Sequence, residues 1–236
     1  MLRARATTAE LLDDLPGSVT SSELAGNLRD LRRANRYFGG ARATLRALRS
    51  VACQLARTHA DEITVLDLAT GAGDVPLAML ALAEREHWPL RVVATDMQPE
   101  VLEIAREVAR PEKLTVALAD ARNLPYADAS FDIVTLSLAM HHFDPQEAGQ
   151  VLAEMRRVGR HALIVNDLER SLPGYAGAWL FGHLLTRNRL TRHDAPLSVR
   201  RAYTAGEALA LAYAAGWRAA KARGAFPFRF VLTGRP

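Results

Sequence analysis

A glycine turn between two acids is the first stretch of this chain whose residue types and spacing could do chemistry. Residues 65–74 read VLDLATGAGD, a short apolar run that leads into Gly71 and Gly73, with Asp67 before the turn and Asp74 after it. A tight glycine turn after a strand lets the backbone approach a bound ligand closely. Because a phosphate and a nucleoside that carries an amino acid both suit such a turn, residues elsewhere must decide between these ligands.

The residues around the turn favour an adenosine that carries an amino acid over a dinucleotide. A dinucleotide-binding turn needs a third glycine, where this chain has Pro76, and the charge of Asp74 would repel a pyrophosphate. Asp74 can instead attract a sulfonium or an amino group, or cap the helix that follows. Asp96 ends the next apolar run and can accept both hydrogen bonds from a ribose diol. After the third run, Asp120 and Ala121 offer an acceptor and a backbone donor for the edge of an adenine.

A pair of adjacent histidines is the second candidate for chemistry. His141 and His142 follow the apolar run 131–139, and one of them could take a proton from a bound substrate. The alternative is that such a histidine packs against the ligand or satisfies a backbone group. Asn166 and Asp167 end a further apolar run and could orient a substrate hydroxyl. These four residues are the predicted catalytic set.

The elements that must position these residues are the strands of a parallel sheet. Short apolar runs at 62–69, 90–96, 114–120, 131–139 and 161–168 alternate with helical patterns, which is typical of strands buried on both faces. Two final strands with no helix between them predict an antiparallel hairpin at the sheet edge. We therefore predict an α/β, Rossmann-like three-layer sandwich with a mostly parallel seven-stranded sheet. Ligands of such sheets bind outside the carboxyl ends of the strands.

The helical patterns outside the sheet predict two appended parts. Residues 1–60 show helical periodicity alone and form an N-terminal helical extension or cap, with Ser21 suited to capping its first helix. Residues 61–236 form the main domain. Within it, residues 170–202 lack clean periodicity and are predicted to form a helical lid.

Composition narrows the class of protein. The 236 residues carry a net charge of +4, but the basic residues are interspersed with acids, so no nucleic-acid partner is expected. The single cysteine, Cys53, cannot form an internal disulfide, which fits the cytoplasm. No apolar run is long enough to span a membrane, and the first residues lack a signal-peptide pattern. No run of metal ligands occurs, so no metal site is predicted.

Three segments carry a resemblance to a known family. They read VLDLATGAGDVPLAML, VVATDMQPEVLEIAR and LADARNLPYADASFDIVTLSLAMHHF. In order and separation they resemble the successive motifs of class I S-adenosylmethionine-dependent methyltransferases, of the kind that includes the quinone-biosynthesis methyltransferases. The resemblance covers residues 63 to about 168 with the closing helix and hairpin. It implies S-adenosylmethionine as cofactor and S-adenosylhomocysteine as product.

The resemblance also implies roles for residues at the strand ends. Gly71 and Gly73 would let the backbone approach the methionine part of the cofactor, and Asp96 would bind the ribose hydroxyls. Met97 would pack on the adenine, or serve as plain core, while Asp67 would contact the ligand or only orient the turn. The predicted cofactor-binding residues are Asp67, Ala69, Thr70, Gly71, Gly73, Asp96, Met97, Asp120, Ala121, Ser137 and Arg36.

Residues of the cap and lid are predicted to close the site. Arg36 is available for the cofactor carboxylate, unless its segment is only a helix that ends at a glycine pair. The arginine-rich residues 187–204 form either a solvated face or a gate for an anionic or phenolate substrate or an acyl carrier. Adjacent residues seldom face each other, so His193 is not expected to pair with Asp194. The predicted substrate-binding residues are Tyr37, Trp179, Arg192, His193 and Arg200.

The sequence thus predicts a cytoplasmic methyltransferase. It would transfer a methyl group to oxygen, or less favourably carbon, of a small hydrophobic aromatic, polyketide-like or quinone-like metabolite. The apolar, aromatic lid favours such a substrate over a macromolecule. Two alternatives stay open: an RNA or protein methyltransferase that docks through the arginine-rich lid, and a non-catalytic protein that binds the cofactor. The acceptor atom and the oligomeric state, a homodimer included, are also open.

Overall fold

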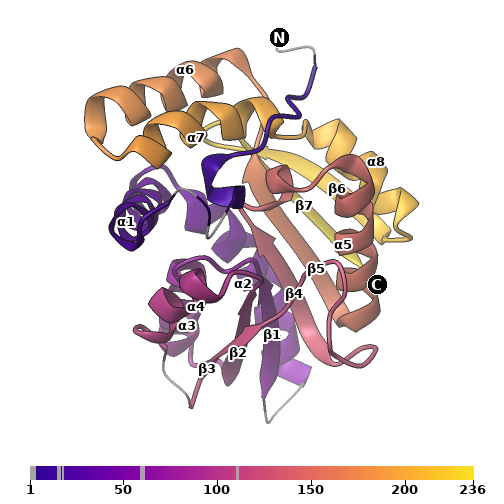
Figure 1. The fold of residues 1–236 in the computed structure, drawn as a ribbon. Coiled ribbons are helices and arrows are strands. Elements are labelled where there is room, and N and C mark those ends of the chain that lie inside the picture. Colours follow the sequence, from indigo (N-terminus) through magenta and orange to yellow (C-terminus); the bar gives the residue numbers. More distant parts are fainter. Residues whose placement is uncertain (1–3, 15–16, 18, 59–61, 110–111) are drawn as a thin grey trace.

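A seven-stranded sheet forms the centre of the molecule (Figure 1). The computed structural model describes residues 4–14, 17, 19–58, 62–109 and 112–236. In this part of the chain the strand order is β3-β2-β1-β4-β5-β7-β6. The strands are β1 (Ile63–Leu68), β2 (Leu90–Asp96), β3 (Leu114–Leu118), β4 (Phe131–Ser137), β5 (Gly159–Leu168), β6 (Arg218–Ala225) and β7 (Arg229–Arg235). All five apolar runs and the closing hairpin are present, so the predicted fold class is confirmed.

The direction of the strands places the candidate site. Strands β1 to β5 pair in parallel, whereas β7 runs antiparallel to β5 and β6 antiparallel to β7. In the register, Asp67 of β1 lies opposite Ala94 of β2 and Thr135 of β4. The carboxyl ends of β1, β2, β4 and β5 therefore meet at one edge of the sheet, where ligands of open α/β folds bind.

Helices cover both faces of the sheet. Every residue of β4 and most residues of β1 and β5 are therefore buried. The helices are α1 (Ser21–Tyr37), α2 (Gly40–Thr58), α3 (Asp74–Glu86), α4 (Pro99–Arg106), α5 (Pro145–Val158), α6 (Leu172–Leu180), α7 (Arg189–Arg201) and α8 (Ala205–Ala214), with the short turns η1 (Leu11–Asp14), η2 (Met140–His142) and η3 (Phe181–Leu185). One apolar core joins the sheet to α5 and α8 through Leu152 and Ala208. A second joins it to α2 and α3 through Leu48 and Met79.

The first helix begins at Ser21, and its capping residue lies one position before the serine that the sequence suggested. Thr20, not Ser21, is the N-cap of α1: its hydroxyl accepts from the backbone N–H of Glu23, and the Glu23 carboxylate accepts from the backbone N–H of Thr20. This reciprocal capping box satisfies two backbone donors that the first turn leaves free. The helix ends at Tyr37 and Phe38, and Gly39 follows with φ +76°, a conformation that glycine adopts without strain.

Helix α1 of the expected cap lies with α6 and α7 of the expected lid beyond the carboxyl edge of the sheet (Figure 1), whereas α2 packs on the face of the sheet. Asn27 and Asp30 of α1 both bond the hydroxyl of Thr191 in α7, at 3.1 and 3.0 Å. The Asp194 carboxylate of α7 accepts from the backbone N–H groups of Leu11 and Leu12 in η1. Residues 170–202, expected as a lid, contain α6, η3 and α7. The expected domain boundary falls within residues 59–61, outside the described residues, and stays a prediction.

Candidate functional site

The glycine turn leaves β1 as expected and is fastened to β2. Ala69, Gly71 and Gly73 all have positive φ angles, of 49°, 57° and 74°. The backbone N–H of Gly71 donates to Oδ2 of Asp96 at 3.0 Å, and the N–H of Gln98 donates to Oδ1 of the same carboxylate at 3.1 Å. Burial raises the pKa of Asp96, although these backbone bonds oppose the shift. Asp96 therefore holds the turn in place, and each of its oxygens keeps lone-pair capacity for a ligand.

A cavity of about 590 Å³ opens beside this edge of the sheet. Seven of the predicted site residues line it: Tyr37, Ala69, Thr70, Gly71, Ser137, His141 and His142. Side chains of α1, α2, α6, α7 and the turn between β6 and β7 complete the wall. The glycine turn and the histidine pair are far apart in sequence, and the structure brings both to the wall of the same cavity.

The other cofactor-binding residues proposed for the strand ends lie outside the cavity lining. The carboxylate of Asp67 is buried and accepts the hydroxyl of Thr135 at 2.6 Å, and burial raises the pKa of Asp67 to about 7. Asp120 pairs with Arg122 at 2.8 Å, and this bond lowers the pKa of Asp120. Met97 is half exposed, and Ala121 is buried. These contacts leave the adenine-reading roles as predictions.

Most of the lid residues named from the sequence also lie away from the cavity. Trp179 is partly exposed and stacks on His183 with ring centroids 4.4 Å apart. The expectation that His193 would not face its neighbour is wrong, because its Nδ1 lies 2.7 Å from Oδ1 of Asp194. Arg36, Arg192 and Arg200 are not among the residues that line the cavity.

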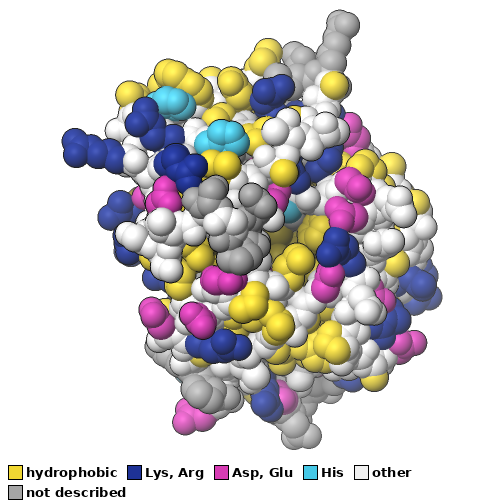
Figure 2. Space-filling view, viewed as in Figure 1, with side chains coloured by type: hydrophobic (Ala, Val, Ile, Leu, Met, Phe, Trp, Pro, Cys, Tyr) yellow, Lys and Arg dark blue, Asp and Glu magenta, His cyan; other side chains and the backbone are white. Residues whose placement is uncertain are grey.

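Four arginines of the arginine-rich lid are exposed, at positions 187, 189, 192 and 200, whereas Arg201 is buried. Figure 2 shows Lys and Arg side chains gathered on the side where α1 and α7 lie in Figure 1, with hydrophobic side chains along the face of α6. The guanidinium of Arg36 lies 6.0 Å from the centroid of the Tyr37 ring. Arg189 pairs with Glu23 of α1 at 3.0 Å. This surface fits the solvated face that the sequence left open.

A carboxylate lies beside the Nδ1 atom of each histidine of the pair. Asp167 accepts from the backbone N–H of His141 at 2.8 Å, and its other oxygen lies 2.8 Å from Nδ1 of the same residue. Nδ1 of His142 lies 2.6 Å from Oδ1 of Asp13. The two rings are 4.3 Å apart between centroids. Because both Nδ1 atoms are engaged, the Nε2 atoms are the nitrogens left for a ligand.

Asn166, the fourth predicted catalytic residue, turns the other way. Its amide donates to the carbonyl of Gly40 at 2.7 Å and to the hydroxyl of Thr44 at 3.0 Å, and its side chain is fully buried. Asn166 therefore fastens α2 to the end of β5. Of the two residues that end this strand, Asp167 is the one that contacts the histidine pair.

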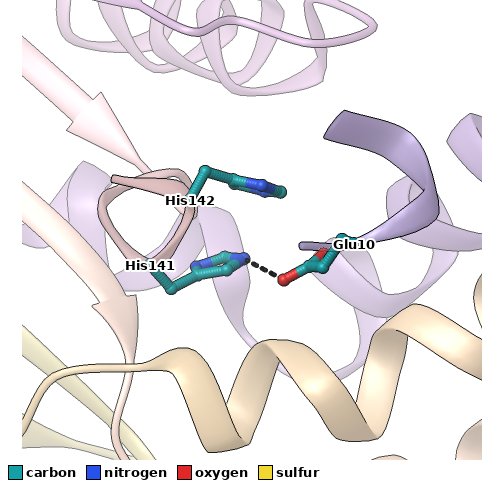
Figure 3. Close-up of side chains that lie close together, drawn as sticks. All are labelled: Glu10, His141 and His142. Carbon is teal, nitrogen blue, oxygen red and sulfur yellow. Dashed lines mark ion pairs between the residues drawn. The ribbon is translucent and has the colours of Figure 1, made fainter. Parts of the chain in front are cut away.

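Glu10 joins the histidine pair from the N-terminal segment, and the sequence analysis missed it (Figure 3). Its Oε1 lies 3.8 Å from Nε2 of His141 and has no hydrogen-bond partner, while Oε2 accepts the hydroxyl of Ser198 at 2.9 Å. Glu10 is almost fully buried and lines the cavity. No local pattern marks it, since α7 and η1 alone bring residue 10 to the end of β4.

The charges around the pair act most strongly on His142. Burial by itself lowers the pKa of this imidazole, but the negative charges of Glu10 and Asp13 outweigh burial and raise the pKa to about 9. The same contact keeps the pKa of Asp13 at about 2. This end of the cavity is therefore a place where positive charge is stabilised.

Comparison with known proteins agrees with the resemblance read from the sequence. A family described as a methyltransferase domain matches residues 65–161. Demethylmenaquinone methyltransferase of Deinococcus radiodurans is 37% identical over 133 residues, which are 52% of this chain and 52% of that protein. Ubiquinone/menaquinone biosynthesis C-methyltransferase UbiE of Citrifermentans bemidjiense is 33% identical over 113 residues, 46% of each chain. The chain spans about half the length of the curated relatives it matches.

Solved structures of methyltransferases share the fold. Human N-acetylserotonin methyltransferase in complex with SAM aligns with a TM-score of 0.67 at 14% identity, over 92% of this chain and 56% of that one. An O-methyltransferase family 2 protein from Planctomyces limnophilus in complex with apigenin aligns at 0.64 and 18% identity, over 93% and 63%. The resemblance to class I S-adenosylmethionine-dependent methyltransferases is thus confirmed. Among the described residues, no helix combines the length and apolar character needed to cross a membrane.

Proposed function

We propose that this protein is an S-adenosylmethionine-dependent methyltransferase that acts on a small hydrophobic molecule with a hydroxyl group, such as a phenol or a quinol. One observation carries the proposal: a single cavity is lined at once by the glycine turn and by Glu10, His141 and His142. The methyltransferase-domain match and the names of the relatives support the reaction type.

The residues at the glycine turn fit the cofactor. A Cβ placed on Gly71 would meet no atom within 4 Å, so this position opens into free space that a ligand can fill. Asp74 lines the cavity beside the turn, and its carboxylate attracts the cationic sulfonium and amino groups of S-adenosylmethionine. Asn35 of α1 donates to Asp74 at 2.9 Å and so closes the cap over the turn. When bound, the cofactor supplies an electrophilic methyl group, and the electron pair of the broken S–C bond stays on sulfur.

The polar end of the cavity is where the acceptor hydroxyl would bind. Removal of the hydroxyl proton makes the oxygen nucleophilic, and in a phenol or quinol it also makes the adjacent ring carbon nucleophilic. The same group of residues therefore suits methylation at oxygen or at carbon. For carbon, the ring proton is lost after transfer, which restores the aromatic ring. Asp167 holds His141 in one orientation throughout.

The walls of the cavity favour a small apolar substrate. Tyr37, Phe38, Phe181, Phe226 and Phe228 all line it, and the ring of Phe38 packs edge-on against Phe181 with centroids 5.7 Å apart. Aromatic walls with a few polar groups at one end are typical of sites for small ligands. A folded macromolecule would reach such a site only through a flexible side chain or an extruded base.

A labelled-methyl assay tests this proposal. The protein is incubated with methyl-labelled S-adenosylmethionine and an extract of bacterial cells, and the label is partitioned among lipid-soluble small molecules, RNA and protein. We expect the label in the small-molecule fraction, where mass spectrometry identifies the acceptor. The variant Asp96→Ala should lose both cofactor binding and transfer, because it frees the glycine turn from β2. Asp128→Ala, at an exposed surface carboxylate, is the matched control.

The alternatives give different results in the same assay. Label in RNA or protein would refute the small-molecule proposal and make the arginine-rich lid a docking surface, with binding that weakens steeply as salt rises. Tight cofactor binding with no label in any fraction would favour a non-catalytic cofactor-binding protein.

A further inference from the structure

We infer that Glu10, His141 and His142 form a binding site for one divalent transition-metal ion, with zinc as the best match. One possible ligand atom from each of these residues lies within 4.8 Å of the other two. Figure 3 shows the three side chains pointing toward one another. All three line the cavity that the glycine turn also lines. The sequence analysis predicted no metal site because the carboxylate and the histidine pair belong to distant parts of the chain.

Both imidazoles are oriented in the way that metal-binding histidines usually are. A histidine that binds a metal through one nitrogen normally bonds a carboxylate or a carbonyl through the other, which fixes its tautomer and direction. Nδ1 of His141 lies 2.8 Å from Asp167, and Nδ1 of His142 lies 2.6 Å from Asp13. Each carboxylate favours a proton on Nδ1, so Nε2 is the nitrogen that would bind a metal ion, in exchange for any proton it carries.

The third ligand is a buried oxygen that accepts no hydrogen bond and lies 3.9 Å from Nε of Arg201. Oε1 of Glu10 is buried and accepts no hydrogen bond, whereas Oε2 is fixed by Ser198. An unpartnered buried carboxylate oxygen is costly unless a cation or a donor reaches it. Oε1 lies 3.8 Å from Nε2 of His141. In a tetrahedral zinc site, with metal–ligand distances of about 2.1 Å, neighbouring ligand atoms are roughly 3.4 Å apart, so a small rotation of these side chains suffices.

Charges of both signs surround the two imidazoles. The carboxylates of Glu10, Asp13 and Asp167 lie beside them. Arg201 donates to the carbonyls of His141 and His142 and to Asp13, and Arg5 donates to the carbonyls of His141 and Phe143. Nε of Arg201 also lies 3.9 Å from Oε1 of Glu10, so a metal ion must compete with this guanidinium for the carboxylate.

Two histidines and one glutamate are a ligand set that leaves a coordination position open. Glu10, His141 and His142 all line the cavity, so an acceptor oxygen bound there would be the fourth ligand of the ion. The metal would lower the pKa of that hydroxyl, and its proton would leave to water before the methyl group is transferred. This role rests on the proposed function, whereas the metal site itself does not.

The test measures metal binding apart from activity. Untagged protein is stripped with a chelator and titrated with Zn²⁺ alone in competition with a chromogenic chelator, and Co²⁺ is used for its absorption spectrum. We expect one ion per chain and a cobalt spectrum typical of four or five ligands. Glu10→Gln and His142→Asn should each weaken zinc binding at least tenfold. His183→Ala removes a histidine that stacks on Trp179 outside the cluster and should leave zinc binding unchanged.

The outcomes separate the metal site from the reaction. Absence of stoichiometric binding, or equal binding by wild type and both cluster variants, would overturn the metal site. If Glu10→Gln fails to fold by circular dichroism, His142→Asn decides the question, because this side chain is partly exposed. Zinc binding at the cluster without any methyl transfer would refute the proposed function and leave the site. Full methyl transfer by stripped protein that binds no zinc would refute the site alone.

Discussion

Replacing Asp167 by asparagine tests whether this carboxylate holds the histidine pair in place. Asp167 is fully buried, and its two oxygens face three nitrogen atoms: the backbone N–H of His141, Nδ1 of His141 and the backbone N–H of Leu168, at 2.8, 2.8 and 2.7 Å. Asparagine has almost the same shape but one oxygen and one NH₂ group. One side of the new amide must therefore face a donor.

The geometry sets the expected cost. If the NH₂ group faces the backbone N–H of His141, two buried donors oppose each other, at about 1–3 kcal/mol for each unsatisfied group. If the amide is flipped, the NH₂ group faces Nδ1 of His141, which must then carry its proton on Nε2, and Leu168 loses its acceptor. The variant also removes a negative charge that favours the buried guanidinium of Arg229. We expect the free energy of unfolding to fall by about 3 kcal/mol.

Urea denaturation followed by circular dichroism measures this change. Asp128→Asn is the control, because Asp128 is exposed and pairs with Arg157 at the surface, so its stability should stay within about 0.5 kcal/mol of wild type. In the folded fraction, methyl transfer should drop with little change in cofactor affinity, since the turn at Gly71 is untouched. An Asp167→Asn protein as stable and as active as wild type would refute the reasoning about this carboxylate.

Three further substitutions test other parts of the structure. Gly71→Ala should weaken cofactor binding in calorimetry and cost about 1 kcal/mol of stability, since φ is +57° at Gly71. Gly149→Ala, in open space on α5, is the control and should be neutral or stabilising. Equal behaviour of the two variants would contradict the assignment of the turn. Gly159→Ala should lower the free energy of unfolding by about 1–3 kcal/mol, because its Cβ would lie 2.6 Å from the side chain of Leu163. An unchanged melting temperature would show that the structure around Gly159 can shift to make room. Burial raises the pKa of Asp67 to about 7, so the folded state keeps a proton that the unfolded chain releases near pH 4. Stability from this group therefore falls as pH rises from about 4 to 7, by at most about 1.4 kcal/mol per unit, and Asp67→Asn should remove that slope in denaturation curves; an unchanged slope would place the titration elsewhere.

The parts of the site that lie on consecutive residues could be read from the sequence. The turn at Gly71 and Gly73 and the pair His141 and His142 each follow an apolar strand, and parallel strands bring their carboxyl ends to one edge. Asp167 was named for the same reason, although as a residue that orients substrate rather than the histidine. Adjacent residues of a strand point to opposite faces of the sheet. The sequence does not say which of Asn166 and Asp167 faces the histidine pair, so both were named.

The contacts of the helices outside the sheet could not be read in this way. Glu10 reaches His141 only because Asp194 fixes the N–H groups of Leu11 and Leu12 and Ser198 fixes its second oxygen. None of these pairs is marked by a local pattern, since each depends on how α7 crosses the end of the sheet. The lid residues Arg192 and Arg200 were named from charge density, which does not determine which side of a helix faces the cavity.

The sequence by itself therefore determined the strands of the sheet, the hairpin at its edge and the loops that form the floor of the site. These follow from hydrophobic period and turn chemistry, which act between near neighbours in the chain. Tertiary structure alone decided which carboxylates surround the histidines and which aromatic side chains wall the cavity. Those contacts join residues that are distant in sequence, and packing of whole helices, rather than any local preference, selects them.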